Sequence, residues 1–467
     1  MMSEHILFLT GQLAERPLKR ILTEMALPDR TWSVRQMGVK VAALMTAEMI
    51  QRRLTDTEGA DWIMIPGRCR GDLDTLTQHF GVPVRRGPEE LMDLPQYFGL
   101  EGKPADLGKY DVRIFAEIVD APRLSVDEIL ERAERFAAEG ADVIDLGCLP
   151  DTPFPHLEQS IEYLKEAGYR VSVDSMSPED LLVAGRAGAD FLLSLNEHSL
   201  WVAEEVDAVP VIIPHPQNDL ASLERAIARM EALGKPYLAD PILDPIHFGF
   251  ADSIVRYHSL RRSHPEVEIL MGVGNLTELT EADTVGINAI LMGLISELGI
   301  TNILTTQVSP HCRTAIREAD RARRVMYWAR QENSLPKQID GGLTGLHERN
   351  PFPYSETEIR ELASEIRDPN FRIQVSTLGI HVYNRDGLHT HSDPFALYPH
   401  LGVDADGSHA FYLGVELARA EIAHQLGKRY VQDRPLAWGC LIDRPEEDMS
   451  RYQAPGTTKR KKKPTGG

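Results

Sequence analysis

An α/β protein, with a (β/α)8 barrel between two smaller α/β domains, is the fold class that the sequence predicts. The chain has 467 residues, too many for one ordinary domain, and 42% of them are hydrophobic, which is enough for sizeable cores. From residue 112 onward, apolar runs alternate with amphipathic helical patterns eight times within about 220 residues, as is typical of such a barrel. An open doubly wound sheet is the competing interpretation, and the even spacing and the count of eight favour closure.

The first segment, residues 1–105, is predicted to form a small α/β domain. Its expected elements are strands at 6–9, 63–67 and 82–84, and a helix with Leu18, Ile21, Leu22 and Met25 on one face. Strand ends that carry Thr10-Gly11 or Pro66-Gly67 are places where such sheets bind ligands. Tight turns alone are the more ordinary explanation of these pairs.

The barrel is predicted to cover residues 106–335. Its eight expected strands are residues 112–118, 142–146, 170–174, 190–195, 209–213, 236–240, 267–271 and 301–305. A third, small α/β domain is expected at 350–445. Its expected elements are a helix at 355–367, a strand at 371–375 and a long helix at about 409–426. The chain then ends in a disordered basic tail at 446–467, which holds the basic run 459–463.

Charge and cysteine content exclude several classes of protein. The formal net charge is −20, with 70 acidic against 50 basic residues. The phosphates of a nucleic acid would repel such a chain, which argues against a general nucleic-acid binder. The four cysteines, Cys69, Cys148, Cys312 and Cys440, are too far apart for a CxxC metal motif or a disulfide framework, which fits a reducing cytoplasm. No apolar stretch approaches the roughly 18 residues of a membrane span, and the first residues lack a signal-peptide pattern.

The chemistry of a (β/α)8 barrel lies at the carboxyl ends of its strands, so the polar residues there are the candidates for a site. They are Glu117, Asp145, Asp174, Asn196, His215, Asp240, Asp244, Asn275 and Gln307. Acids and amides without lysine or arginine suit a neutral or weakly basic heterocycle, because carboxylates accept from ring N–H and amino groups. Singly, Asp174 and Asn196 are as easily helix caps and Asn275 a turn residue. Together, at four strands of one barrel, they favour a site.

Four segments carry a resemblance to dihydropteroate synthases and their pterin-binding relatives. Residues 137–147 (AAEGADVIDLG) resemble the "GADIIDIGG" strand of that family, and 171–175 (VSVDS) its "ISIDT". Residues 188–196 are similar to its "GADIIND". Both 240–241 and 243–250 are similar to its "LDPGFGFGK". The resemblance spans about 110 to 330 and implies a pterin-binding barrel in which Asp174, Asn196 and Asp240 or Asp244 hold the aminopyrimidine ring.

The departures from that family concern its anion sites. Residues 274–276 (GNL) stand where the family has Ser-Arg-Lys, and 304–307 (LTTQ) where it has Arg-x-His. The Asn-Val-Thr loop after the first strand is replaced by 117–119 (EIV), and the "ESTRPG" loop by 148–153 (CLPDTP). The pterin site is therefore expected to be kept, and the diphosphate and aminobenzoate sites are not. The missing cation would come from a bound Mg²⁺, from Arg68 and Arg70, or from Arg385.

Two further resemblances complete the functional prediction. Residues 272–275 (GVGN) are similar to the "GLSN" of methyltetrahydrofolate–corrinoid methyltransferases, which implies that Asn275 contacts a pterin. The three-domain layout resembles dihydropteroate-synthase-like proteins associated with tetrahydromethanopterin synthesis. That resemblance implies a transferase that joins a pterin to an arylamine. The alternatives are methyl transfer from a methyl-pterin to a corrinoid protein, and a non-catalytic pterin-binding scaffold.

The resemblance also assigns roles and partners. Asp174, Asn275 and Asp240 are the expected catalytic residues. The expected pterin contacts are Glu117, Asp145, Asp174, Asn196, Asp240, Asp244, Asn275 and Gln307. We expect a homodimer with no covalently bound cofactor, a pterin as ligand, Mg²⁺ as the one candidate ion, and neither nucleic acid nor membrane as partner. The histidines at 381, 389, 391, 400 and 409 are more simply scattered surface residues than a metal site, so no protein metal ligands are predicted.

Overall fold

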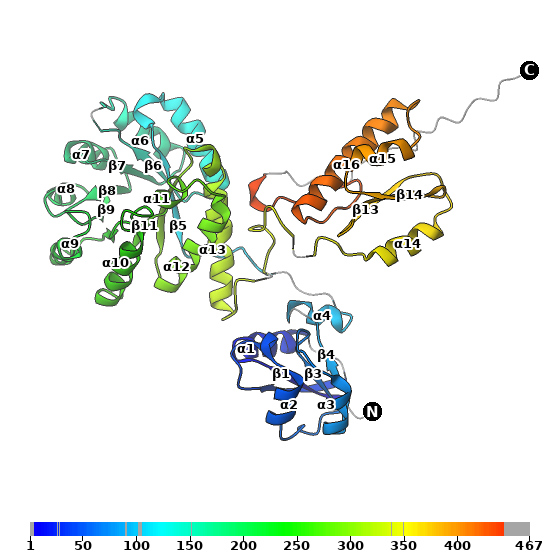
Figure 1. Ribbon diagram of the computed structural model, residues 1–467. Coiled ribbons are helices and arrows are strands. Elements are labelled where there is room, and N and C mark those ends of the chain that lie inside the picture. The colour runs from blue at the N-terminus through cyan, green and yellow to red at the C-terminus, as the bar shows by residue number, and fades with distance from the viewer. Residues whose placement is uncertain are drawn as a thin grey trace, which may run out of the picture. The chain divides into compact units, whose positions relative to one another are not determined.

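The computed structural model describes residues 4–25, 27, 29–88, 91–100, 105–150, 152–337, 339–348 and 350–442 (Figure 1). The predicted basic tail at 446–467 lies outside these residues. Contacts divide the chain into one unit of residues 1–113, 292–302 and 322–340, and a second of 114–291, 303–321 and 341–467.

The N-terminal sheet has four parallel strands in the order β2-β1-β3-β4. They are β1 (Glu4–Thr10), β2 (Arg30–Gln36), β3 (Trp62–Ile65) and β4 (Val84–Arg86). Its helices are α1 (Gln12–Met25), α2 (Ala47–Arg53), α3 (Leu73–Phe80) and α4 (Leu94–Tyr97). The sequence predicted three of the four strands. It missed β2 because this strand (RTWSVRQ) is polar, has no fully buried residue and pairs with β1 at the edge of the sheet.

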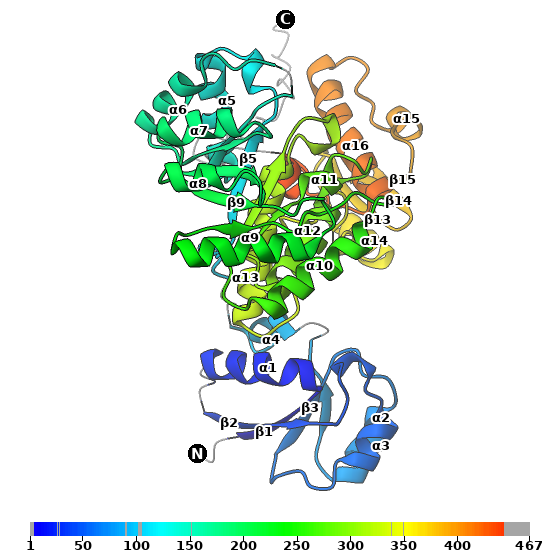
Figure 2. The same cartoon turned by 90° about the vertical axis from the view of Figure 1, so that its left-hand side faces the viewer.

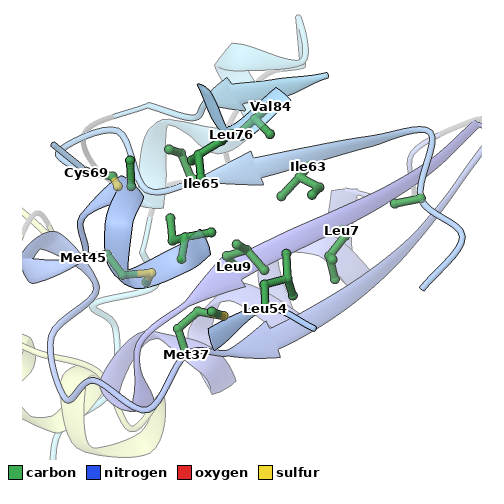
Figure 3. Packing of buried hydrophobic residues seen from close by; sticks show 13 residues of the cluster. Leu7, Leu9, Met37, Met45, Leu54, Ile63, Ile65, Cys69, Leu76 and Val84 are labelled. Carbon is green, nitrogen blue, oxygen red and sulfur yellow. The ribbon is translucent and has the colours of Figure 1, made fainter. Parts of the chain in front are cut away.

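Both faces of the N-terminal sheet are covered, because its strands alternate two sets of buried side chains. Ile6 and Phe8 pack with Leu18 and Leu22 of α1 on one face. Leu7 and Leu9 pack on the other in a cluster that includes Ile50 of α2 and Leu76 of α3, and Figure 3 shows this cluster. This is the doubly wound arrangement, whose carboxyl strand ends are left open to ligands.

The second sheet confirms the predicted barrel, with eight strands in the order β10-β9-β8-β7-β6-β5-β12-β11. A parallel bridge between Ala239 of β10 and Ile269, the residue before β11, brings the two ends of the sheet together, so the barrel is nearly closed. The strands are β5 (Arg113–Ile118), β6 (Val143–Gly147), β7 (Val171–Asp174), β8 (Phe191–Leu195), β9 (Val209–Ile212), β10 (Leu238–Ala239), β11 (Leu270–Gly272) and β12 (Asn302–Thr306). Every predicted strand is present, although β10 is reduced to two residues.

Helices follow the barrel strands, and Figures 1 and 2 show them around the sheet. They are α5 (Val126–Glu139), α6 (Leu157–Glu166), α7 (Pro178–Arg186), α8 (Trp201–Glu205), α9 (Leu220–Leu233), α10 (Phe250–Ser263), α11 (Gly274–Thr277), α12 (Thr284–Leu298) and α13 (Ala315–Gln331). The first begins at a capping box, in which Ser125 and Glu128 bond each other's backbone N–H groups. The inner layer of the barrel consists of Phe115, Val143, Phe191, Leu193, Val211, Leu238 and Leu270.

The third sheet is antiparallel, in the order β13-β14-β15. Its strands are β13 (Arg372–Ser376), β14 (Gly379–Asn384) and β15 (Gly387–His391), and its helices are α14 (Glu356–Glu365), α15 (Pro394–Leu397) and α16 (Gly407–Leu426). Leu413 and Leu417 of α16 pack on Ile373 and Val375 of the sheet. The predicted helices at 355–367 and about 409–426 and the predicted strand at 371–375 therefore all lie close to observed elements.

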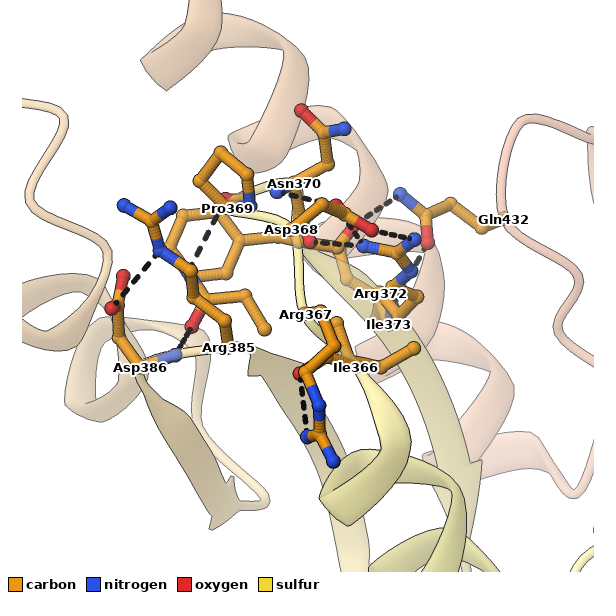
Figure 4. Close-up of polar contacts among 12 residues, drawn as sticks. Ile366, Arg367, Asp368, Pro369, Asn370, Arg372, Ile373, Arg385, Asp386 and Gln432 are labelled. Atoms are coloured by element: carbon orange, nitrogen blue, oxygen red, sulfur yellow. Dashed lines mark hydrogen bonds and ion pairs between the residues drawn. The ribbon is translucent and has the colours of Figure 1, made fainter.

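Polar contacts fix the turn that leads into β13 (Figure 4). Arg372 donates two hydrogen bonds to the carboxylate of Asp368, at 2.5 and 2.7 Å, and these bonds lower the pKa of Asp368 to about 2. Arg385 lies 3.4 Å from the carboxylate of its neighbour Asp386. None of the helices in the described part of the chain is long and apolar enough to cross a membrane.

The C-terminal histidines do not gather into one group. The rings of His389 and His400 stack with centroids 4.0 Å apart, whereas His381 is buried and bonds Ser376 and Thr390. Within the described residues, the one cluster of three groups able to hold a metal ion lies elsewhere, in the barrel.

Candidate active site

Three adjacent strands bring three carboxylates together at the carboxyl end of the barrel. In the register of the sheet, Glu117 of β5 lies beside Asp145 of β6, and Gly147 of β6 beside Asp174 of β7. Phe115 and Val143 belong to the inner layer, and side chains alternate along a strand, so Glu117 and Asp145, two residues further on, also face inward. Oxygen atoms of the three carboxylates lie within 4.8 Å of one another. We call Glu117, Asp145 and Asp174 the carboxylate cluster.

Serine hydroxyl groups hold one oxygen of each aspartate. Ser172 Oγ donates to Asp145 Oδ1 at 2.5 Å, and Ser194 Oγ donates to Asp174 Oδ1 at 2.7 Å. The other oxygen of Asp145, Oδ2, is buried and has no hydrogen-bond partner among the described residues. An unpaired buried acceptor is costly, so this atom marks a place for a donor from outside the protein.

The cluster depends on a glycine and on a strand irregularity. A Cβ atom added to Gly147 would lie 2.6 Å from Glu117 Oε1, so only glycine leaves room for this carboxylate. Ser194 adopts a φ of 77° where the pairing of β8 with β9 shifts register. The irregularity interrupts the alternation after Leu193 and lets the serine reach Asp174. The hydrophobic pattern gives no sign of Ser194, because a bulge leaves no mark in it, whereas Ser172 lies two residues before Asp174 in β7 and was overlooked although strand alternation places it on the same face.

Burial and mutual repulsion raise the pKa values of the whole cluster. The pKa of Glu117 rises to about 7, first through burial and then through the charge of Asp174. The pKa of Asp145 rises well above its usual range through burial and through the charges of Asp174 and Glu117, and burial also raises that of Asp174. No described lysine or arginine pairs with any of the three. The cluster therefore favours any ligand that supplies hydrogen-bond donors or positive charge.

This electrostatic arrangement predicts how stability depends on pH. Between about pH 4.5 and 7 the folded protein keeps a proton on Glu117 that the unfolded chain releases, so the stability of the barrel falls as the pH rises through this window. The contribution is at most about 3 kcal/mol. We expect urea unfolding of the Glu117→Gln variant to show a smaller slope than the unaltered protein, with a remainder from Asp145, Asp174 and Asp240, whose pKa values are also raised. The matched control is Glu166→Gln on the exposed surface of α6, and an equal loss of slope there would contradict the assignment to Glu117.

Asp240 faces the same site from the far side of the barrel. It follows Leu238 of the inner layer by two residues, and its Oδ1 accepts hydrogen bonds from the Tyr257 hydroxyl at 2.6 Å and from the Ile242 N–H at 2.7 Å. Burial raises the pKa of Asp240 to about 6, and the charge of Asp174 adds to the rise. Tyr257, which the sequence analysis did not name, is completely buried and fixes this carboxylate.

Asp244 is instead tied into an ion pair with an arginine that the sequence analysis overlooked. Arg256 of α10 donates to Asp244 Oδ2 at 2.6 Å and to the carbonyl oxygens of Pro241 and Ile242. Gln217 donates to the other oxygen of Asp244 at 2.8 Å. The expectation of a rim without arginine was therefore wrong. Arg256 lies there because α10 follows the loop after β10, but its donors hold that loop together.

The predicted site residues Asn196, His215 and Asn275 are engaged locally. Asn196 Oδ1 accepts from the N–H of His198 in a turn, and His215, which is exposed, donates its N–H to Ser222. Asn275 is exposed and donates to the carbonyl oxygen of Leu243 at 2.7 Å. None of the described contacts joins these residues to the carboxylate cluster, and their contact with a ligand stays a prediction.

Gln307 is directed toward a helix. Its Nε2 donates at 2.8 Å to Glu139, the last residue of α5, which also pairs with Arg317. Of the nine strand-end residues, the structure thus brings Glu117, Asp145, Asp174 and Asp240 to one site. The position of each in its strand was the signal that identified them.

Residues 4–89 match a family described as a family of unknown function, DUF6513. "Uncharacterized protein MJ0107" of Methanocaldococcus jannaschii is 26% identical over 527 aligned residues, which cover 92% of this chain and 98% of that protein.

Solved structures similar to this chain include dihydropteroate synthases, over about half of its length. The Yersinia pestis enzyme with a pterine-sulfa conjugate is 18% identical, covers 48% of this chain and 95% of its own, and has a TM-score of 0.38. The Xanthomonas albilineans enzyme in complex with 7,8-dihydropteroate is 21% identical, with 47% and 93% coverage and a TM-score of 0.37. The Coxiella burnetii enzyme in complex with pteroic acid is 16% identical, with 47% and 94% coverage and a TM-score of 0.39. At this level, the similarities concern the barrel fold and do not assign an activity.

Proposed function

We propose that the barrel binds a reduced pterin at the carboxylate cluster and joins it to an arylamine, in the synthesis of a tetrahydromethanopterin- or folate-type one-carbon carrier. The observation that carries this proposal is the group of raised-pKa carboxylates with the unpaired Oδ2 of Asp145. A pterin presents an amino group and ring N–H groups along one edge, and carboxylates accept from such donors. Each charge-assisted hydrogen bond contributes about 1.5–3 kcal/mol, since the acceptors are already desolvated.

Each member of the site has a separate role in this proposal. Asp145 and Asp174 accept from the amino-pyrimidine edge through the oxygens that the serines leave available. Asp240, fixed by Tyr257, accepts from the ring on the opposite side. Glu117, with a pKa of about 7, is matched to take the proton that the arylamine nitrogen releases as it forms its bond to the pterin methylene carbon. The leaving group on that carbon departs with the electron pair of the broken C–O bond.

A diphosphate leaving group also needs positive charge. The donor set fits a divalent cation, because three carboxylates supply oxygen ligands and one of their oxygens is unpartnered. When bound, Mg²⁺ would supply charge stabilisation for the leaving oxygens. Glu117, Asp145 and Asp174 would hold such an ion only in the absence of the pterin, because the same oxygens accept from the pterin edge in this proposal.

Two experiments test the proposed reaction. Deletion of the gene, with the cellular content of methanopterin-type cofactors measured, should lower that content, and unchanged content would remove the proposal. Purified protein is expected to form no dihydropteroate from p-aminobenzoate and hydroxymethyl-dihydropterin diphosphate alone, because the anion sites of folate synthases are replaced. Methyl transfer from a methyl-pterin to a corrinoid protein in vitro would establish the second candidate, which rests on the GVGN segment at 272–275.

A further inference from the structure

The N-terminal sheet has its own topological switch point. In the order β2-β1-β3-β4, the chain leaves β1 toward β2 on one side and returns to β3 on the other. Ligands of doubly wound sheets bind outside the carboxyl ends of the two strands at such a point. Thr10 ends β1, and Pro66-Gly67 follows β3. These are the two strand ends that the sequence analysis had singled out.

A cavity of about 260 Å³ lies at this switch point. Thr10, Pro66 and Gly67 all line it, together with Gly87 and Pro88 after β4. Its walls are mainly apolar and include Leu13, Ala14, Leu18, Val41, Met64 and Leu94. Leu13 and Val41 are each about two-fifths exposed, at 39% and 40%, although both are large apolar side chains. Pockets for drug-sized ligands measure about 300–1,000 Å³, so this cavity suits a single ring.

The charged residues of the lining have one sign. Arg20, Arg68 and Lys337 line the cavity, and no described lining residue is acidic, in a chain with 70 acidic and 50 basic residues. Arg20 also forms an ion pair with Glu332, so its charge is partly compensated. Arg68 and Lys337 are both exposed, and Arg68 follows the strand end at Pro66-Gly67.

The first backbone N–H groups of α1 do not contribute an anion site to the cavity. The N–H groups of Gln12 and Leu13 donate to the carbonyl oxygens of Val39 and Lys40, at 2.8 and 3.1 Å. The close approach behind these bonds requires glycine, because a Cβ atom at Gly11 would lie 2.6 Å from the Ala42 nitrogen. Recognition of an acid therefore depends on the side-chain cations of the lining, and Arg68 is the one that follows the strand end at Pro66-Gly67.

We propose that the N-terminal domain binds a small organic acid, a single apolar ring that carries a carboxylate or phosphate group, in this cavity. The ring replaces water against Leu13, Val41 and Met64, and the acidic group lies toward Arg68. This site is separate from the carboxylate cluster and does not depend on the reaction proposed for the barrel.

Calorimetric titration of the full chain tests the proposal with three probes: benzoate, phenyl phosphate and the neutral benzyl alcohol. We expect at least one of the two acids to bind at least ten-fold more tightly than the alcohol, and the better acid identifies the acidic group. The Arg68→Met variant should lose at least five-fold in affinity for that acid. Arg16→Met, the same change at an exposed position of α1 outside the lining, should lose none.

Steric filling provides a second test. Ala14→Phe places a ring in the cavity and should abolish binding of the acid while the circular dichroism of the chain is unchanged. The proposal is overturned if neither acid binds with a dissociation constant of about 10 mM or lower, which corresponds to a binding free energy of about −3 kcal/mol. It is equally overturned if the neutral alcohol binds as tightly as the acids, or if Arg68→Met and Arg16→Met behave alike.

Discussion

Replacing Asp174 by asparagine is expected to weaken binding of a dihydropterin roughly ten- to a hundred-fold, because it removes a charge-assisted hydrogen bond. The asparagine can still accept from Ser194 through its side-chain oxygen, so the local fold is kept. The substitution replaces the carboxylate oxygen that faces the ligand by an amide NH₂ group. This group is a donor, so it cannot accept from the N–H groups of the pterin edge. Calorimetry with the variant measures the loss directly, and unchanged affinity would exclude Asp174 from the site.

The same substitution is expected to stabilise the free protein. Asp174 raises the pKa values of Glu117, Asp145 and Asp240 through its charge, so a neutral residue relieves repulsion within the site. The matched control is Asp190→Asn, at the opposite ends of the strands, where the carboxylate pairs with Lys165. The control should lower stability and leave pterin affinity unchanged. Opposite signs of the two stability changes are the signature of a ligand site.

Replacing Arg256 by methionine is expected to destabilise the barrel by about 3–5 kcal/mol, because it leaves a buried carboxylate without its partner. The side chains of Arg256 and Asp244 are only 11% and 9% exposed. The substitution also frees the carbonyl oxygens of Pro241 and Ile242, which shape the loop after β10. Chemical denaturation followed by circular dichroism gives the size of the loss.

Two comparisons separate the ion pair from a general effect of losing charge. Arg229→Met removes an exposed pair with Glu204 on neighbouring helices and should cost less than about 1 kcal/mol. The double variant Arg256→Met/Asp244→Leu should recover part of the stability, since replacing both buried partners by apolar groups is far less costly than removing one. A loss at Arg256 no larger than at Arg229 would show that the loop does not depend on the pair.

The barrel was predictable because its signal is repeated eight times, and parallel strands buried on both faces appear as plain apolar runs. The weakest strand shows the limit of this signal. Residues 236–240 read as a five-residue strand, but only Leu238 and Ala239 pair, since the following segment turns back to bond Asp240 and Arg256. The polar edge strand β2 has no apolar run and was missed altogether.

The site was predictable where strand alternation alone places a side chain. Glu117, Asp145 and Asp240 each lie two residues beyond a side chain of the inner layer. The apolar pattern that predicts the strands therefore also predicts that these three side chains face inward. Ser194 was not predictable, because its orientation depends on the irregularity in β8. The partners of Arg256, Tyr257 and Gln307 are set by how helices pack, and this packing cannot be predicted from any single segment of the sequence.

The central claim is that the carboxylate cluster recognises the amino-pyrimidine edge of a pterin. Its most direct test is calorimetric titration of the unaltered chain with 6-hydroxymethyl-7,8-dihydropterin and with the analogue that carries oxygen in place of the 2-amino group. We expect the pterin to bind at least ten-fold more tightly, which corresponds to about 1.4 kcal/mol for the missing donors. Equal affinity for the two compounds, or no binding of either, would contradict the account.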